Sequence, residues 1–156
     1  MSLYNEKIIY GEDIGITIAT MFDAKRMVLL DYYGYHYIMH GTSITHKINP
    51  KTVESFVNSC ANVKDIFTSK HYCEEHIADE MQRRLLIHID WLLNVDVKDK
   101  EKKSYLRKMR NTEYAKEALR ASSANLDRNN KIKKYFFGKR LFSCLCLLKR
   151  MYDRRK

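Results

Sequence analysis

Residues 74–94 carry the clearest helical pattern of the 156-residue chain and read EEHIADEMQRRLLIHIDWLLN. Apolar residues recur there at spacings of three and four, which places them on one side of a helix. They are Ile77, Met81, Leu85, Ile89, Leu92 and Leu93. The segment therefore predicts a long amphipathic helix whose apolar side needs partners elsewhere in the chain.

A second helix is expected just before this segment. It would follow Asn49 and Pro50, and proline is well tolerated in the first turn of a helix. Its apolar positions again have helical spacing: Val53, Phe56, Val57 and Cys60. The two segments together predict a pair of packed helices in the middle of the chain.

The first fifty residues have a different pattern. Four of the five glycines and the single proline lie there, so turns are concentrated in this part of the chain. Ile14, Ile16 and Ile18 alternate with small or polar residues, which is the period of a strand. Further strands are expected at residues 26–32 and 35–39, with residues 7–10 as a candidate fourth. The prediction is an α+β fold, in which an N-terminal antiparallel β-meander precedes a small helical bundle.

Helices are also expected after residue 95. Residues 104–124 contain no glycine or proline and are rich in residues that favour helix. Serine and asparagine residues within 122–130 compete for backbone hydrogen bonds and predict a break. A final helix is expected from Lys131 or Lys139 to Tyr152, basic on one side and apolar on the other. The apolar side would consist of Leu141, Cys144, Leu145, Leu148, Met151 and Tyr152.

The charge of the chain is divided unevenly along its length. Over all 156 residues, 29 Lys and Arg outnumber 19 Asp and Glu, and the formal net charge is +10. Residues 1–95 carry −3 and residues 96–156 carry +13. We therefore expect a near-neutral α+β core over 1–95 and a basic helical segment over 96–156, packed together as one domain. Such an excess of positive charge favours a phosphate-bearing partner.

The basic segment has the composition of a nucleic-acid-binding surface. Lys and Arg along a helix match a polyphosphate backbone, and neutralising phosphates releases condensed counterions. Tyr135, Phe136 and Phe137 lie among these cations and could stack unpaired bases. The sequence predicts binding to nucleic acid, RNA rather than DNA, in a ribosome or another nucleoprotein particle. The expected binding residues are Lys102, Lys103, Arg107, Lys108, Arg110, Lys131, Lys133, Lys134, Lys139, Arg140, Lys149, Arg150, Arg154 and Arg155.

Two other classes of partner stay open. An accessory protein of viral or parasitic style, which acts by binding another protein, would make its contact through residues 1–95 and would not need the basic segment. A peripheral protein of anionic membranes would use residues 139–152, which have the composition of an interfacial helix. The cations before residue 111 favour nucleic acid, because membrane docking by the final helix would not use them.

A cluster of cysteine and histidine residues is a candidate structural zinc site. Zinc takes four such ligands in a tetrahedron, and the candidates are Cys60, His71, Cys73 and His76. No pair of Cys-x-x-Cys knuckles is present, so the spacing does not match a standard zinc module. The alternative is that Cys60 is a small core residue and the histidines are ordinary polar positions. Reduced thiols are expected at all four cysteines.

No motif in the sequence identifies an enzyme. A phosphate-binding glycine loop, a nucleophile elbow or a protease triad cannot be assembled from its residues. No apolar run approaches the roughly 20 residues that a membrane span requires. The first ten residues lack the apolar region of a secretory signal, so an intracellular protein, cytoplasmic or nuclear, is expected.

Overall fold

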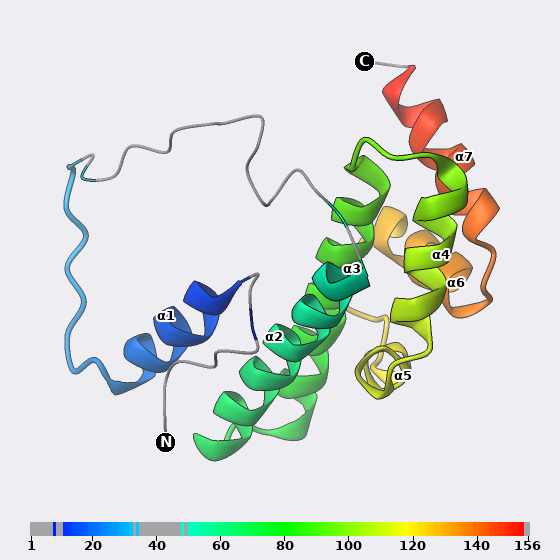
Figure 1. Cartoon of the computed structure of the whole chain (residues 1–156). Coiled ribbons are helices and arrows are strands. Elements are labelled where there is room, and N and C mark those ends of the chain that lie inside the picture. Colours follow the sequence, from blue (N-terminus) through cyan, green and yellow to red (C-terminus); the bar gives the residue numbers. More distant parts are fainter. Residues whose placement is uncertain (1–7, 9–10, 33, 35–47, 49, 155–156) are drawn as a thin grey trace.

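The computed structural model describes residues 8, 11–32, 34, 48 and 50–154, and every regular element among them is a helix (Figure 1). No strand occurs within these described ranges. The predicted α+β fold with an N-terminal β-meander is therefore wrong, and the described chain is all-helical.

Helix α1 (Glu12–Asp23) occupies the segment that predicted the first strand. The run from Ile14 to Ala19 is apolar or small at nearly every position, so it fits a period of two and a helical period equally well. Its packing on α2 decides between them. A Cβ on Gly15 would stand 2.4 Å from Asn62 Nδ2, and Ala19, one turn later, is buried. Small residues four apart let two helices approach closely, which the alternation of isoleucines does not indicate.

The other expected strands are not found in the described chain. Residues 26–32 are irregular and exposed, and no backbone hydrogen bond joins them to another described segment. Without a neighbouring strand, their apolar side chains do not form a sheet face. The expected strands at 7–10 and 35–39 lie outside the described residues, except for Ile8, which is buried.

Helices α2 (Pro50–Ser69) and α3 (Glu74–Asn94) confirm the two helices predicted for the middle of the chain. They run antiparallel and lie side by side (Figure 1). The ring of Phe56 stacks on His88 at a centroid distance of 4.5 Å and meets the edge of Trp91 at 4.6 Å. These contacts fix the start of α2 against the end of α3.

The rest of the described chain forms four shorter helices, α4 (Asp99–Arg110), α5 (Glu113–Arg120), α6 (Arg128–Gly138) and α7 (Phe142–Asp153). The helix expected over 104–124 is divided at Asn111 and Thr112. The Thr112 hydroxyl accepts the Ala115 amide at 3.2 Å and caps α5. The expected break within 122–130 is confirmed by the loop between α5 and α6. Of the two starts expected for the final helix, Lys131 is wrong because residues 139–141 form a turn between α6 and α7. The later start, Lys139, lies three residues before α7, so Lys139 and Arg140 precede that helix.

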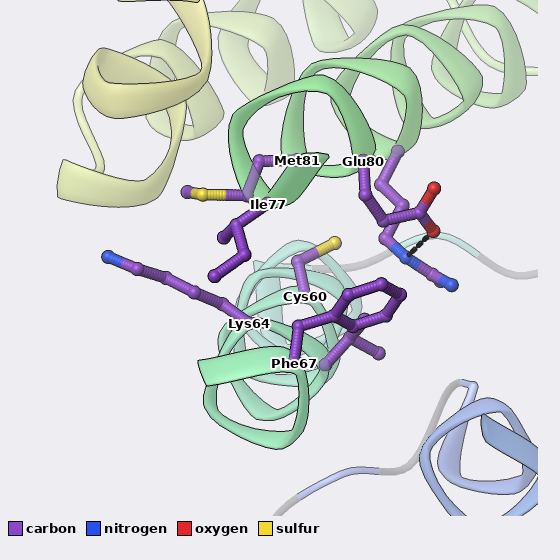
Figure 2. Close-up of a pocket in the computed structure, with 8 residues that line it drawn as sticks. Cys60, Lys64, Phe67, Ile77, Glu80 and Met81 are labelled. Carbon is purple, nitrogen blue, oxygen red and sulfur yellow. Dashed lines mark ion pairs between the residues drawn. The ribbon is translucent and has the colours of Figure 1, made fainter. Parts of the chain in front are cut away.

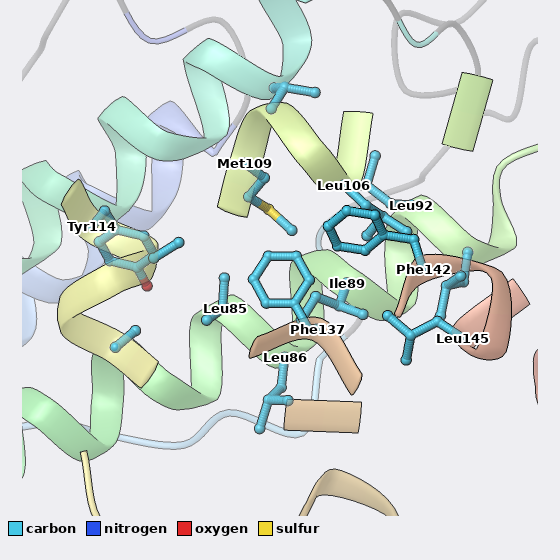
Figure 3. Packing of buried hydrophobic residues seen from close by; sticks show 14 of the residues in the cluster. Leu85, Leu86, Ile89, Leu92, Leu106, Met109, Tyr114, Phe137, Phe142 and Leu145 are labelled. Atoms are coloured by element: carbon cyan, nitrogen blue, oxygen red, sulfur yellow. The ribbon is translucent and has the colours of Figure 1, made fainter. Parts of the chain in front are cut away.

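The hydrophobic core is built around α3, which packs against α2, α4, α5, α6 and α7. Leu85, Ile89 and Leu92 line the buried side of α3 and are at most 1 % exposed. Phe137 of α6 and Phe142 of α7 meet this side from across the core (Figure 3). The near-neutral segment and the basic segment therefore contribute to one hydrophobic cluster.

The longest described helices are not suited to a bilayer. Helix α3 has 21 residues but carries charged side chains along its outer side, Arg83 among them. In the parts of the chain that the structure describes, no helix combines the length and the apolar character of a membrane span.

Candidate nucleic-acid interface

Helices α4 and α7 are packed against each other and run antiparallel, which brings cations of the basic segment together (Figure 1). At one end, Arg150 of α7 forms an ion pair with Asp99 at the start of α4. At the other end, Arg110 donates from Nε and Nη2 to the carbonyl oxygen of Gly138, each at 3.4 Å. These two contacts fix the relative direction of the helices.

One flank of α4 presents cations toward α7. At 100° per residue, Lys103, Arg107 and Arg110 fall within about 60° of one another around the helix axis. Burial raises the pKa of the Cys146 thiol on α7, and the charges of Lys102 and Lys103 oppose that shift, so both lysines lie near α7. Arg107 is exposed and Arg110 is half-buried.

Three contacts join this flank to the basic residues that follow α6: Arg110 reaches the Gly138 carbonyl oxygen, Arg140 reaches Asn111, and Arg150 of α7 reaches Asp99. We call the whole set the α4–α7 basic surface. Its residues are Lys103, Arg107, Arg110, Lys139, Arg140, Arg150 and Arg154. Within the described chain, only Arg150 of this set has a carboxylate partner. Lys108 is exposed on the solvent side of α4, and Arg155 lies outside the described residues.

Three of the expected binding lysines are instead engaged inside the fold. Lys134 is buried, and its Nζ donates to the side chain of Gln82 and to the Ala121 carbonyl oxygen, the latter at 2.5 Å. Lys133 forms an ion pair with Asp90 at 2.5 Å. Lys102 donates to the Leu93 carbonyl oxygen at 2.7 Å and so satisfies the last turn of α3. We leave these three lysines out of the α4–α7 basic surface because their charged groups have partners and their side chains are buried or half-buried. Arg150 is kept because it stays 61 % exposed despite its ion pair.

Two further expected residues are placed differently. Lys149 is half-buried and forms an ion pair with Asp153 one turn along α7. Lys131 is exposed on α6, where it lies one turn before Tyr135. Lys131 has no ion-pair partner among the described residues, so it is available to a ligand even though it belongs to a different helix.

Only one of the three aromatic residues at the end of α6 is available for stacking. Phe137 is fully buried, and Phe136 packs against the hydrophobic core. Tyr135 is 58 % exposed. A base could therefore reach the Tyr135 ring, whereas the Phe137 ring serves the core.

The outer side of α7 is apolar and exposed. The buried residues of this helix are Phe142, Leu145 and Cys146. The expected apolar stripe is thus divided: Leu145 faces the core, and the remaining large apolar residues face outward. The exposed residues are Leu141, Leu147, Leu148, Met151 and Tyr152.

The candidate zinc ligands lie at two separate places. His71, Cys73 and His76 are exposed at and after the turn between α2 and α3, and Cys73 Sγ lies 3.1 Å from His76 Nδ1. Cys60 is buried on α2, and its Sγ lies 3.4 Å from His88 Nδ1. His88 follows His76 by twelve residues, about 18 Å along a helix. Among the described residues no three potential ligands come together, so a zinc site stays a prediction.

The contact between Cys60 and His88 belongs to the core. Burial raises the pKa of the Cys60 thiol to about 11, so the thiol is protonated near neutral pH. Burial and the nearby positive charge of Arg84 lower the pKa of His88 to about 4. A neutral thiol beside a neutral imidazole is not an activated nucleophile. The sequence reasoning missed His88, and its position between the buried Leu85 and Leu92 was the available signal.

A small recess lies between α2 and α3, and Figure 2 shows the side chains that line it. Cys60 and Lys64 of α2 face Ile77 and Glu80 of α3 across it. Glu80 Oε1 also forms an ion pair with Arg84 Nε at 2.7 Å. The lining side chains leave no room for a water molecule between them. Ligand pockets commonly enclose about 300–1,000 Å³, so we assign no small-molecule site here.

Comparisons of the chain with protein-family models, with curated proteins and with solved structures found no match. The function proposed below is therefore argued from the described residues and their chemistry.

Proposed function

We propose that this protein binds nucleic acid, RNA in preference to DNA, with the phosphate backbone lying along the α4–α7 basic surface. The proposed role is that of a binding component of a nucleoprotein particle rather than that of an enzyme. The cations of α4 and the cations of the turn and α7 would contact successive phosphates.

The observation that carries the proposal is that all of these cations except Arg150 lack a carboxylate partner among the described residues. Between residues 50 and 95, four of the five Lys and Arg residues form ion pairs within the described chain. Between residues 96 and 154, only four of eighteen do. Unpaired cations on adjoining helices repel one another, and a polyanion relieves that repulsion while it releases its own counterions.

Tyr135 supports a single-stranded nucleic acid over a duplex. It lies on α6 one turn after Lys131 and one turn before Lys139, so the exposed ring stands between two exposed cations. Unpaired bases stack on such rings, at about 1–3 kcal/mol per base. Single-stranded RNA offers unpaired bases, whereas a DNA duplex does not.

The test is a measurement of RNA affinity against salt concentration by fluorescence anisotropy. The probe is a single-stranded RNA oligonucleotide, and a single-stranded DNA of the same sequence and a DNA duplex of equal length are measured in parallel. We expect tighter binding to RNA and an affinity that falls steeply between 50 and 200 mM salt. Binding that does not depend on salt would contradict the proposal.

Charge reversal then locates the surface. The double variant Arg107→Glu with Arg154→Glu changes two exposed cations that have no ion pair in the described chain. It should lower RNA affinity by about 100-fold at low salt. The matched control is Arg120→Glu with Arg128→Glu, which makes the same change in net charge on exposed residues of α5 and α6. Equal losses in the two double variants would show that net charge, and not this surface, determines binding.

Deletion of residues 96–156 would not test the proposal. Leu106, Met109, Phe137 and Phe142 belong to the hydrophobic cluster around α3, so the deletion would expose the core. A loss of RNA binding would then report unfolding. Point changes on the exposed face keep the two effects apart.

A protein partner is the second candidate, and a specific observation favours it. Residues 27–32 lie in an irregular segment between α1 and α2, and Met27, Val28, Leu29 and Leu30 are each more than 60 % exposed. Exposed apolar residues in a row are typical of a contact with another chain. Variants Val28→Ser and Leu30→Ser should abolish capture of such a partner and leave RNA affinity unchanged. If they lower RNA affinity instead, this segment belongs to the RNA site or to the fold.

A membrane surface is the third candidate, and it would use the outer side of α7. Leu147, Leu148 and Met151 are exposed there, beside the basic residues Arg150 and Arg154. Apolar residues flanked by cations are typical of helices that lie in the interface of anionic bilayers. Flotation with vesicles of phosphatidylcholine, with and without phosphatidylserine, separates this candidate from RNA binding. The double variant Leu147→Ser with Met151→Ser removes two of these exposed apolar side chains. If the unmodified chain floats with the vesicles and this variant does not, membrane binding through α7 is supported.

A further inference from the structure

Two arginines lie close together where α4 ends beside the turn between α6 and α7. We infer that Arg110 and Arg140 form a phosphate-binding site, with one phosphate group held between their guanidinium groups. Under the proposed function, on which this identification of the ligand's source rests, that phosphate belongs to the RNA backbone.

The backbone conformation of Arg140 is the first observation. Helix α6 ends in a pattern in which the Arg140 amide donates to the Phe137 carbonyl oxygen at 3.1 Å and the Leu141 amide donates to the Phe136 carbonyl oxygen at 2.8 Å. In this helix ending, one residue after the cap adopts the left-handed conformation and is most often glycine. Here that residue is Arg140, with φ of 60°.

Arginine at this position is not explained by the backbone. Gly138 stands two residues earlier, inside the helix, where a Cβ would make only an ordinary contact of 3.7 Å with Leu119. The other described non-glycine residue with positive φ is His71, and histidine is among the residues that accept this conformation more readily. A side chain that is kept at a strained position points to a role for that side chain.

The charge around Arg110 is the second observation. Burial lowers the pKa of Arg110, and the positive charge of Arg140 lowers it further. No carboxylate among the described residues opposes these two effects. The fold therefore holds two guanidinium groups near each other without a counterion from the described chain.

The hydrogen bonds of the two side chains are the third observation. Arg140 donates from Nη2 to Asn111 Oδ1 at 3.2 Å, and Arg110 uses Nε and Nη2 on the Gly138 carbonyl oxygen at 3.4 Å. These are long contacts to neutral acceptors. They orient both guanidinium groups but leave other N–H groups of each for a ligand, since a guanidinium has five.

The chemistry of the pair favours a phosphate. The planar guanidinium fork binds two oxygens of one phosphate at once, and such charge-assisted bonds are about twice as strong as neutral ones. A phosphate that accepts hydrogen bonds from both arginines would attract each guanidinium group and so offset the repulsion between them. Arg107 stands one turn before Arg110 on the same flank and would meet the next phosphate of a chain.

The first experiment tests the site without RNA. Inorganic phosphate is titrated into the full chain, and the arginine side-chain Nε–H signals are followed by NMR, with sodium chloride at equal ionic strength as the reference. We expect saturable shifts of the Arg110 and Arg140 signals that Arg120 and Arg128 do not show. Unchanged Arg110 and Arg140 signals, or equal shifts at all four arginines, would overturn the inference.

The second experiment tests the source of the phosphate. Arg110→Gln with Arg140→Gln should lower RNA affinity about tenfold more than the control Arg120→Gln with Arg128→Gln, which removes the same charge. If phosphate shifts the NMR signals of Arg110 and Arg140 but the chain does not bind RNA, the phosphate site is supported and the proposed function is contradicted. If the chain binds RNA and the two double variants lose equal affinity, the proposed function is supported and the phosphate site is contradicted.

A third variant separates the side chain of Arg140 from its backbone. Arg140→Gly suits the left-handed conformation, so its Tm should equal or slightly exceed that of the unmodified chain. Its phosphate-dependent shift at Arg110 should disappear. A normal Arg110 response in this variant would show that Arg140 takes no part in binding.

Discussion

Helices α3 and α4 share one hydrophobic core but differ in whether their Lys and Arg side chains form ion pairs within the described chain. On α3, Glu80 forms ion pairs with Arg83 and Arg84 of its own helix, both at 2.7 Å. On α4, none of the six Lys and Arg residues has an ion pair within the described chain. The carboxylate of Glu80 thus pairs with the arginines of α3, whereas the Lys and Arg side chains of α4 have no carboxylate partner among the described residues and are, under the proposed function, open to an external anion.

The largest effect is expected where both regions depend on the same core residue. Phe137 is fully buried beside α3 and α4, so Phe137→Ala should lower the free energy of unfolding by about 3–5 kcal/mol. Urea denaturation followed by circular dichroism measures the change. A single transition that moves as a whole would confirm one cooperative unit. A transition that splits, with α2 and α3 unaffected, would show that the two regions fold separately.

The next effect is on the pH dependence of stability and concerns His88 of α3, which packs against Cys60 and Phe56 of α2. His88 has a pKa of about 4 in the fold, against 6.5 when exposed. The unfolded chain therefore binds this proton first, and stability is lost as the pH falls from about 6.5 toward 4. The loss should amount to about 2–3 kcal/mol between pH 7.5 and 4.5. Denaturation curves at both values, compared with those of His88→Phe, measure it, and an equal pH dependence in the variant would contradict the assignment.

A smaller effect separates a structural lysine from binding lysines. Lys134→Met removes the bonds to Gln82 and to the Ala121 carbonyl oxygen, so the buried Gln82 side chain and the half-buried Ala121 carbonyl both lose a donor. It should cost about 1–3 kcal/mol of stability. The salt dependence of RNA affinity should stay as in the unmodified chain. A shallower salt dependence would place Lys134 among the binding cations after all.

The smallest effect concerns Asp99, the one carboxylate among the described residues that forms an ion pair with the α4–α7 basic surface. Asp99→Asn removes the partner of Arg150, whose side chain is 61 % exposed. Exposed ion pairs contribute little, so stability should change by less than about 1 kcal/mol. Freed from its partner, Arg150 should raise RNA affinity a few-fold. Anisotropy titrations measure this gain, and a decrease in affinity would mean that the pair positions Arg150 for the ligand.

The helices that were predicted correctly have one clear period and a clear start. The stripe from Ile77 to Leu93 allows only a helix, and Pro50 marks the beginning of α2. The strand predicted at residues 14–19 was wrong because nearly every side chain there is small or apolar. Both the strand period and the helical period therefore fit, and only packing against Asn62 selects the helix. Local pattern cannot supply that contact, since Asn62 is distant in the sequence.

The basic composition of the candidate interface could be predicted from the sequence, but which lysines and arginines belong to it could not. The sequence indicates a basic segment, yet the number of charges does not tell that Lys134 turns inward to Gln82 while Arg107 faces solvent. The arginine pair was also hidden, because the left-handed turn at Arg140 lacks the glycine that usually marks it. Both features depend on how α6 meets its neighbours.

The position of α3 at the centre of the core has a consequence for synthesis. Its apolar side is complete by Asn94, but Phe142, Leu145 and Cys146, which cover part of it, are made about 50 residues later. At about 5–20 residues per second this leaves α3 partly uncovered for about 3–10 s. During that interval the nascent chain presents an apolar helix beside a lengthening run of cations, so a chaperone or an early anionic partner would meet it before its own last helix does.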